Sequence, residues 1–378
     1  MYFLTEKDAN YSIKGSRDPL GFQVIWQAAG RKLIPNISTV SNNIIDFQIL
    51  CLAYTFKNEL KIEDKDFESF FIRFEQIMAY IRLENKIDKE RGFNGVDKVR
   101  KLMTTNPPNY RISTENQILS NQKAYGIWGK YNRPFTDMQI TSSISFDTIF
   151  SEKIKANQDF KKQISSIVKN NDTKLKSIVL ESFASLIGNH TQKEKELFTK
   201  TVLQDTCNQE LLSIFNTSEE WKQLSFYDLM NFLDANSTNE VFKSILRYIV
   251  QTEKTISPLN RIFRYLQTKS YWKNEDIKKD EFITNCRAKI DTSGFDDTSK
   301  SLAKLHDFNN LELVQGLVKR NETICHLRNS SSWMELTENG IDINHFEGAL
   351  FDKDYNPELH SDNNYFLGSY KALYNQLN

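Results

Sequence analysis

The chain contains few of the residues that interrupt helices and none of the usual zinc-binding spacings. Its 378 residues include only 13 glycines and 7 prolines. So few breakers favour long uninterrupted elements, and therefore helices over many short strands. The four cysteines, Cys51, Cys207, Cys286 and Cys325, lie far apart and form no CxxC pair. This spacing argues against zinc ribbons and zinc fingers, so we expect neither a metal nor a cofactor.

The chain also lacks an excess of either charge and any long apolar run. Lys and Arg together number 49, as do Asp and Glu, so the formal net charge is zero. A dedicated nucleic-acid binder usually has a basic excess, and any basic surface here must be local. No run approaches the ~20 apolar residues that span a bilayer, and the first residues lack the layout of a signal peptide. We therefore expect a soluble, cytoplasmic protein with free thiols and no membrane contact.

Large apolar side chains, by contrast, are plentiful. Hydrophobic residues make up 39% of the chain, with 26 Phe and 15 Tyr, which is enough to build a substantial core. The stretch NIIDFQILCLAYTF is almost continuously apolar and predicts a buried helix. DKDFESFFIRFEQIMAYIRLENK places apolar residues three and four positions apart, as an amphipathic helix does. The predicted fold class is all-α, a multi-helix bundle with one small late β-hairpin.

Composition predicts two helical domains. Residues 1–131 form an N-terminal domain with an irregular first segment, residues 132–146 a polar linker, and residues 147–378 a C-terminal domain. In the latter, NEVFKSILRYIVQTEK and PLNRIFRYLQTK predict consecutive helices separated at the proline. Ser225 and the run 237–239 are expected to cap helices. Asn339-Gly340 lies between two short apolar stretches and predicts the hairpin, over residues 333–343.

Two segments combine basic and aromatic residues. GSRDPLGFQVIWQAAGRKLIPN carries Arg17 and further basic residues and could contact phosphates, or it could form a turn that Trp26 anchors to the core. AYGIWGKYNRPF places Trp128 beside Lys130 and Arg133. Such interleaving can stack bases and bind phosphates, and we expect these three residues to contact nucleic acid. The alternative is a buried corner in which the paired glycines let backbones approach closely.

The segment LVKRNETICHLRN combines residue types that can cleave RNA without a metal. That reaction needs a proton acceptor and donor, for which the imidazole of His326 is suited near neutral pH. It also needs a cation beside the phosphate, a role for the bidentate fork of Arg320. Asn321 could orient either partner. On a helix, Arg320 and His326 would lie roughly 120° apart, so both could border one cleft.

The spacing Arg320-Asn321-x4-His326 resembles the motif of the HEPN superfamily (higher eukaryotes and prokaryotes nucleotide-binding). The resemblance implies an all-α, metal-independent endoribonuclease, possibly a toxin or antiphage-defence effector, that acts on RNA in a multi-component system with protein partners. It also implies a homodimer through the helix of residues 309–328. The implied catalytic residues are Arg320, Asn321 and His326. The segment after the histidine, LRNSSSW, departs from the helical continuation often seen in that family.

Two other interpretations of this region stay open. The helix followed by WMELTENG and IDI resembles the last helix and wing of a winged-helix DNA-binding domain, with Lys319, Arg320 and Arg328 on phosphates. The wing is acidic, however, and would repel a phosphate backbone. The chain could also be a non-enzymatic helical interaction subunit of a bacterial defence complex, in which case these polar residues belong to an ordinary helix end.

Overall fold

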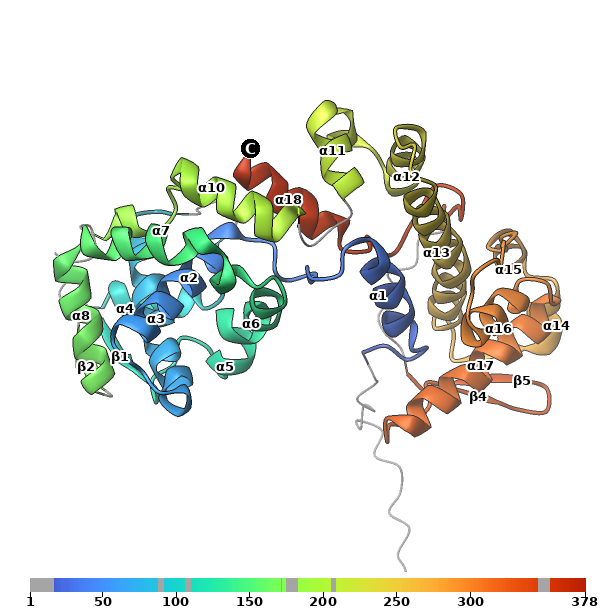
Figure 1. The fold of residues 1–378 in the computed structure, drawn as a ribbon. Coiled ribbons are helices and arrows are strands. Elements are labelled where there is room, and N and C mark those ends of the chain that lie inside the picture. The colour runs from blue at the N-terminus through green and yellow to red at the C-terminus, as the bar shows by residue number, and fades with distance from the viewer. Residues whose placement is uncertain are drawn as a thin grey trace, which may run out of the picture. The chain divides into compact units, whose positions relative to one another are not determined.

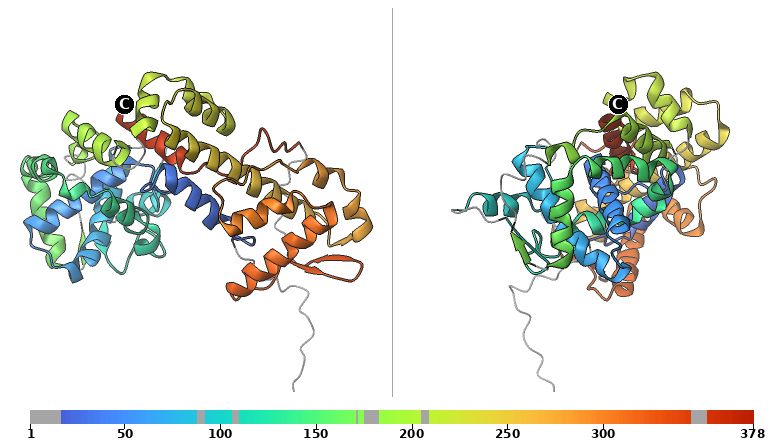
Figure 2. Two further views of the ribbon diagram at one scale, coloured as in Figure 1. Left: turned by 45° about the vertical axis from the view of Figure 1, so that its right-hand side comes forward. Right: turned by 60° about the vertical axis from the view of Figure 1, so that its left-hand side comes forward.

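A computed structural model describes residues 17–87, 92–105, 110–170, 172–174, 183–204, 209–345 and 354–378. The chain forms two compact units. Unit 1 comprises Met1–Leu33 and Ser213–Tyr365, and unit 2 comprises Ile34–Leu212 and Phe366–Asn378. Both units are therefore built from segments that lie far apart in the sequence. Figures 1 and 2 show the predicted fold class, mainly α-helical with a small late β-hairpin.

The division differs from the predicted domains, because residues 132–146 lie inside unit 2. They form the end of α6 (Ile127–Asp137), the 3-10 turn η1 (Ile140–Ser142) and the start of α7 (Ile144–Lys155). All three elements pack against α2 (Ile44–Glu59). Their polar residues made the segment look like a linker, whereas apolar side chains such as Phe135, Ile140 and Phe146 are buried within it.

Unit 2 is organised around α2 and α3 (Asp64–Glu84), which lie among its other helices (Figure 1). Both helices carry buried aromatic residues. Asn43 caps α2 by accepting a hydrogen bond from the Ile45 N–H at 2.9 Å. Phe56 and Phe74 meet across the two helices with ring centroids 6.0 Å apart. The other elements of the unit are α4 (Val96–Met103), β1 (Arg111–Ser113), α5 (Gln122–Tyr125), α8 (Gln158–Lys169), β2 (Asp172–Lys174), η2 (Ala184–Leu186), α10 (Gln192–Phe198), the π-helix η3 (Thr199–Gln204) and α18 (Leu367–Leu377).

Unit 1 is built on the long helix α13 (Glu240–Leu266), against which α1 (Phe22–Leu33), α12 (Phe226–Ala235), α16 (Asp297–Leu305) and α17 (Asn310–Leu327) pack. Its core joins the apolar face of α13 to Leu313, Leu317 and Trp333. The shorter elements are η4 (Glu220–Gln223), β3 (Tyr271–Lys273), α14 (Asn274–Lys278), α15 (Glu281–Asn285), β4 (Met334–Leu336) and β5 (Gly340–Ile343), and α11 (Gln209–Thr217) crosses from unit 2 into unit 1.

Helix α13 corrects one prediction, because it runs through Pro258 without a break. A proline in a helix removes one backbone hydrogen bond and crowds the preceding turn, which costs about 3 kcal/mol. The apolar face continues on both sides of the proline, where Ile249, Ile256, Leu259 and Phe263 are buried. Packing of that continuous face outweighs the local cost, so the two predicted helices are one. The cap predictions are confirmed, with Ser225 capping α12 and Asn239 capping α13.

The predicted hairpin is confirmed as β4 and β5, joined by a turn in which the Thr337 N–H donates to the Gly340 carbonyl at 2.9 Å. The earlier strand β3 pairs with β5, so the sheet order is β3-β5-β4, antiparallel throughout. Gly340 lies opposite Lys273, and a Cβ there would come within 2.1 Å of the Trp272 carbonyl oxygen. Only glycine therefore allows this close pairing.

The described residues include three of the four cysteines. Cys51, Cys286 and Cys325 are free and buried, and Cys207 lies outside the described residues. Within those residues, no helix combines the length and hydrophobicity that crossing a lipid bilayer requires.

Candidate functional site

Helix α17 carries the residues predicted to be catalytic. Its first turn is closed by a capping box, in which Asn309 and Glu312 each accept a hydrogen bond from the backbone N–H of the other. Its buried face, with Leu313, Leu317 and Cys325, packs into the core of unit 1. The predicted residues are placed around the helix by this packing.

Asn321 lies on the buried face of α17 and has no exposed surface. Its Nδ2 donates to the Pro19 carbonyl at 3.0 Å, and its Oδ1 accepts from the Trp333 N–H at 2.8 Å. The amide thereby satisfies two main-chain groups, the half-buried Pro19 carbonyl and the buried Trp333 N–H, which lie 302 and 12 residues away. Asn321 therefore holds together three segments of unit 1.

Arg320 and Arg328 hold the same N-terminal segment. The Arg320 Nε donates to the Leu20 carbonyl at 2.7 Å, and its guanidinium lies 5.5 Å from the centre of the Phe22 ring. Burial lowers the pKa of the Arg320 guanidinium, and the negative charge of Asp18 offsets part of that shift. Arg328 forms an ion pair with Asp18 at 3.0 Å. Both arginines therefore bind residues 18–20 and hold them against α17.

The three predicted catalytic residues are not brought to one place. His326 is exposed, whereas Asn321 is buried and Arg320 is half-buried. Their angular separation on the helix, expected from the sequence, places the histidine on the solvent side and the asparagine on the core side. Within a single chain, the structure therefore gives Arg320 and Asn321 a role in packing.

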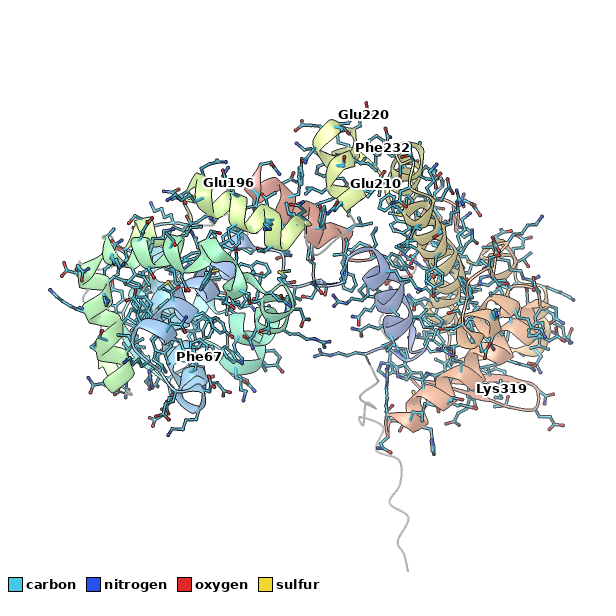
Figure 3. The ribbon with its side chains drawn as sticks, viewed as in Figure 1. Phe67, Glu196, Glu210, Glu220, Phe232 and Lys319 are labelled. Carbon is cyan, nitrogen blue, oxygen red and sulfur yellow. The ribbon has the colours of Figure 1, made fainter. Side chains whose placement is uncertain are left out.

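Among the described residues, Lys319 is the one predicted phosphate-contacting cation of this helix whose side chain has no hydrogen-bond or ion-pair partner. Lys319 is exposed on α17 (Figure 3), while Arg320 and Arg328 are engaged with residues 18–20. The hairpin that follows exposes three acidic side chains, at Glu335, Glu338 and Asp342. The resemblance to winged helices predicts a helix followed by a hairpin, and this arrangement is present. The exposed side chains of the hairpin are acidic, however, and would repel a phosphate backbone.

The other predicted nucleic-acid contacts lie in unit 2, on α6. Trp128 is half-buried, with its ring centre 5.3 Å from that of Phe71, and it packs on the core of the unit. Arg133 is exposed and faces Asp137 at 3.7 Å. A Cβ at Gly129 would come within 2.1 Å of the Ala124 carbonyl oxygen. A close backbone approach at the paired glycines was part of the alternative interpretation of the segment, although Gly129 itself is exposed.

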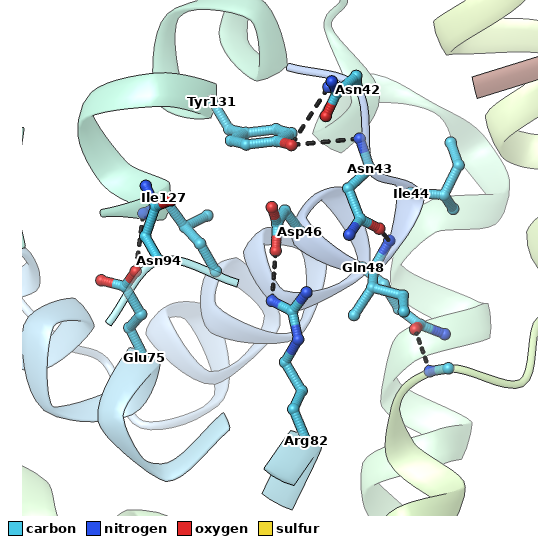
Figure 4. Close-up of polar contacts among 12 residues, drawn as sticks. Asn42, Asn43, Ile44, Asp46, Gln48, Glu75, Arg82, Asn94, Ile127 and Tyr131 are labelled. Atoms are coloured by element: carbon cyan, nitrogen blue, oxygen red, sulfur yellow. Dashed lines mark hydrogen bonds and ion pairs between the residues drawn. The ribbon is translucent and has the colours of Figure 1, made fainter. Parts of the chain in front are cut away.

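Unit 2 contains a cavity of about 590 Å³ that none of the predictions had placed. Figure 4 shows polar contacts of several residues that line it. It lies among α2, α3 and α6, with residues 92–96 and Ala372 completing its wall. Its polar lining includes Asp46, Glu75, Arg82 and Tyr131. Sizeable concave sites with a few converging polar groups are the usual places for ligands.

A buried ion pair forms one wall of this cavity. Arg82 Nη1 lies 2.6 Å from Asp46 Oδ1, and their side chains are 2% and 13% exposed. The Phe93 ring covers the guanidinium, 4.8 Å from its central carbon. Beside the pair, the Tyr131 hydroxyl accepts the N–H groups of Asn42 and Asn43, both at 3.2 Å. Burying two charges costs several kcal/mol, so the pair needs the good geometry seen here.

Glu75 forms the opposite wall and has no cation within ion-pair distance among the described residues. Its carboxyl accepts the Ile127 N–H at 2.7 Å and the Gln122 Nε2 at 2.8 Å. Burial raises the pKa of Glu75 to about 7 against these two hydrogen bonds. A Cβ at Gly126 would come within 2.6 Å of the carboxyl, so glycine is needed for the carboxyl to reach the start of α6.

Lys130 adds a positive charge to the rim of the cavity. It is half-buried on α6, and no carboxylate lies within ion-pair distance of it in the described part of the chain. The cavity therefore contains one paired set of charges, Asp46 with Arg82, and two single charges of opposite sign, Glu75 and Lys130.

The sequence contains charged residues within apolar runs that mark this cavity. Asp46 interrupts the apolar run NIIDFQIL, and Glu75 and Arg82 occur within FIRFEQIMAYIRLE. Charged residues in a buried helix are rarely tolerated without a partner or a function. The sequence did not show that Asp46 and Arg82 are partners, because the two residues are 36 positions apart in the chain.

Among the described residues, no three His, Cys, Asp or Glu side chains are grouped as metal ligands would be. Comparisons with protein-family models, with curated proteins and with solved structures find no match to this chain.

Proposed function

We propose that the protein is a non-enzymatic helical subunit whose unit 2 binds a small zwitterionic molecule in the cavity among α2, α3 and α6. The observation that carries this proposal is the presence of two single charges, Glu75 and Lys130, on one cavity of about 590 Å³. A molecule with a protonated amine and a carboxylate would match one charge with each. The α17 residues support the non-enzymatic part, because Arg320 and Asn321 hold main chain.

A bound zwitterion would compensate the buried charge of Glu75. A carboxylate in a water-poor site is costly unless it is paired, and the raised pKa of Glu75 expresses that cost. An ammonium group at hydrogen-bond distance would stabilise the ionised form. Lys130 can adjust to the other end of the molecule because its long side chain is flexible and near the rim. The Asp46–Arg82 pair also lines the cavity and would contribute polar surface to it.

The proposal predicts selective stabilisation of the protein by zwitterions. Amino acids, small amines and small carboxylates would be compared in thermal-shift assays, and those that stabilise the protein would be titrated by calorimetry at pH 8. We expect zwitterions to bind more tightly than molecules that carry only one of the two charges. Glu75→Gln and Lys130→Gln should each weaken the best zwitterion about tenfold, since each removes one charge-assisted contact.

Exposed charges on the first turn of α3 provide matched controls. Glu63→Gln and Lys65→Gln change the same charges at side chains that are 68% and 75% exposed and that do not line the cavity. Both should bind as the wild type does. Binding that is equally tight in Glu75→Gln, or no stabilisation by any of the three classes, would refute the proposal.

The metal-independent ribonuclease stays a prediction that can be tested directly. Purified protein would be incubated with a labelled RNA strand in EDTA, beside Arg320→Ala and His326→Ala. With Asn321 buried and Arg320 bound to the Leu20 carbonyl, we expect the RNA to stay intact in all three samples. Cleavage by the wild type that His326→Ala abolishes would establish the enzyme instead, and light scattering would then show whether it is a dimer.

A further inference from the structure

A second, smaller pocket lies in unit 1, beside the residues that Asn321 holds. Its volume is about 220 Å³, and it lies between the start of α1, the C-terminal half of α13 and Trp333. Aromatic rings of Phe22, Trp26 and Phe263 form part of its lining. This pocket is independent of the cavity in unit 2, since every residue that lines it belongs to unit 1.

Trp333, one of the residues that line the pocket, carries a buried donor that lacks an acceptor. Trp333 is 1% exposed, and its indole Nε1–H has no hydrogen-bond partner among the residues that the structure describes. A buried donor without a partner destabilises the folded state, and such groups are rare enough in folded proteins to need a reason. The other two buried indoles of the unit do have partners, Trp221 through the Phe215 carbonyl and Trp272 through the Leu266 carbonyl.

Two arginines of the same pocket are also without a counter-charge. Arg17 precedes α1 and Arg264 lies in the last turn of α13, and both side chains are exposed at the pocket. Neither takes part in an ion pair within the described ranges. The one carboxylate in the lining, Asp18, is already occupied by Arg328 at 3.0 Å and by the Phe22 N–H at 2.8 Å. The free groups that face this pocket are therefore mostly donors.

Asn321 sets the width of the pocket. Its amide bonds the Pro19 carbonyl on one side and the Trp333 N–H on the other, and both residues are walls of the pocket. Arg320 and Arg328 fix the neighbouring residues Leu20 and Asp18. The polar residues of α17 that resemble a catalytic motif therefore hold the residues on two sides of this pocket in place.

We propose that this pocket binds a phosphate group, with the Trp333 indole N–H and the guanidinium groups of Arg17 and Arg264 donating to its oxygens. Arginine suits this role because its planar fork can donate two parallel hydrogen bonds to a phosphate. A phosphate with two negative charges would match the two arginines. The volume also leaves room for a small attached group, which the rings of Phe22 and Trp26 would contact.

The test uses the full chain labelled with ¹⁵N-tryptophan. Inorganic phosphate, phenyl phosphate and acetate would be titrated at constant ionic strength, with calorimetry for affinity and the five indole N–H signals for location. We expect both phosphates to bind and to shift the signal of Trp333 downfield, as a new hydrogen bond does, with acetate binding at least tenfold more weakly. Tighter binding of phenyl phosphate would identify an ester as the source of the group.

Three variants make the test decisive. Trp333→Phe keeps a ring but removes the N–H, and Arg264→Gln removes a charge at an exposed position, so the fold should survive in both. Each is expected to weaken phosphate about tenfold or more. Lys319→Gln removes an exposed charge from the same unit outside the pocket and should change nothing. Unchanged affinity in Arg264→Gln, or an unmoved Trp333 signal, would overturn the proposal.

Discussion

Replacing Asn321 with alanine is expected to lower the free energy of unfolding of unit 1 by about 3 kcal/mol. The change removes the partner of the Pro19 carbonyl and leaves the buried Trp333 N–H without an acceptor, and it opens a small cavity at a position with no exposed surface. Urea unfolding followed by tryptophan fluorescence measures the loss. Four of the five tryptophans, Trp26, Trp221, Trp272 and Trp333, belong to unit 1, so the signal reports mainly on that unit.

The neighbouring residue supplies the control for this experiment. Lys319→Ala alters an exposed side chain on the same helix turn, and its effect should stay within about 0.5 kcal/mol. A loss below about 1 kcal/mol in Asn321→Ala would mean that water replaces the amide. In that case the asparagine would be available for chemistry, and the ribonuclease prediction would gain support.

Unit 2 is expected to lose about 3 kcal/mol of stability through Glu75 as the pH rises from 4 to 8. Burial raises the pKa of this carboxyl from 4.5 to about 7 in the folded chain. Between these values the folded state keeps a proton that the unfolded state has released. The stabilisation is therefore complete below pH 4.5 and disappears as the pH rises through 7. Hydrogen exchange of peptides from α3 and α6 in urea would measure it.

Comparison with Glu75→Gln isolates this carboxyl from the other titrating groups. Burial lowers the pKa of His190, also in unit 2, so its contribution to stability grows as the pH rises through its ordinary value and opposes that of Glu75. Because both proteins contain His190, the difference between their pH profiles belongs to Glu75. Parallel profiles would show that the carboxyl is solvated, and the charge argument for the cavity would fail.

The candidate sites were only partly predictable, and the reason differs between them. The α17 residues were conspicuous because Arg320, Asn321 and His326 match the residue types of a known chemistry at a matching spacing. Spacing along one helix gives the angle between two side chains but not which side is buried. That was decided by the N-terminal segment, which meets α17 from about 300 positions away.

The sequence did not predict the cavity in unit 2 or the pocket beside Trp333, for a related reason. Asp46, Glu75 and Arg82 are each a charged residue within an apolar run. Whether such a charge has an ion-pair partner depends on how α2, α3 and α6 pack. Trp333 gave no signal at all, because an unsatisfied indole N–H exists only once the surrounding chain has closed around it.

The sequence alone determined the helical class, the caps at Ser225 and Asn239, and the hairpin at Asn339-Gly340, because these depend on the spacing of apolar residues and on turn chemistry within a few positions. Only the tertiary structure decided that Pro258 interrupts nothing, that residues 132–146 belong to the core of unit 2, and that the α17 polar residues hold main chain. Each of these outcomes depends on packing against segments that are distant in the sequence. Local patterns carry no information about which distant segment packs against a given helix.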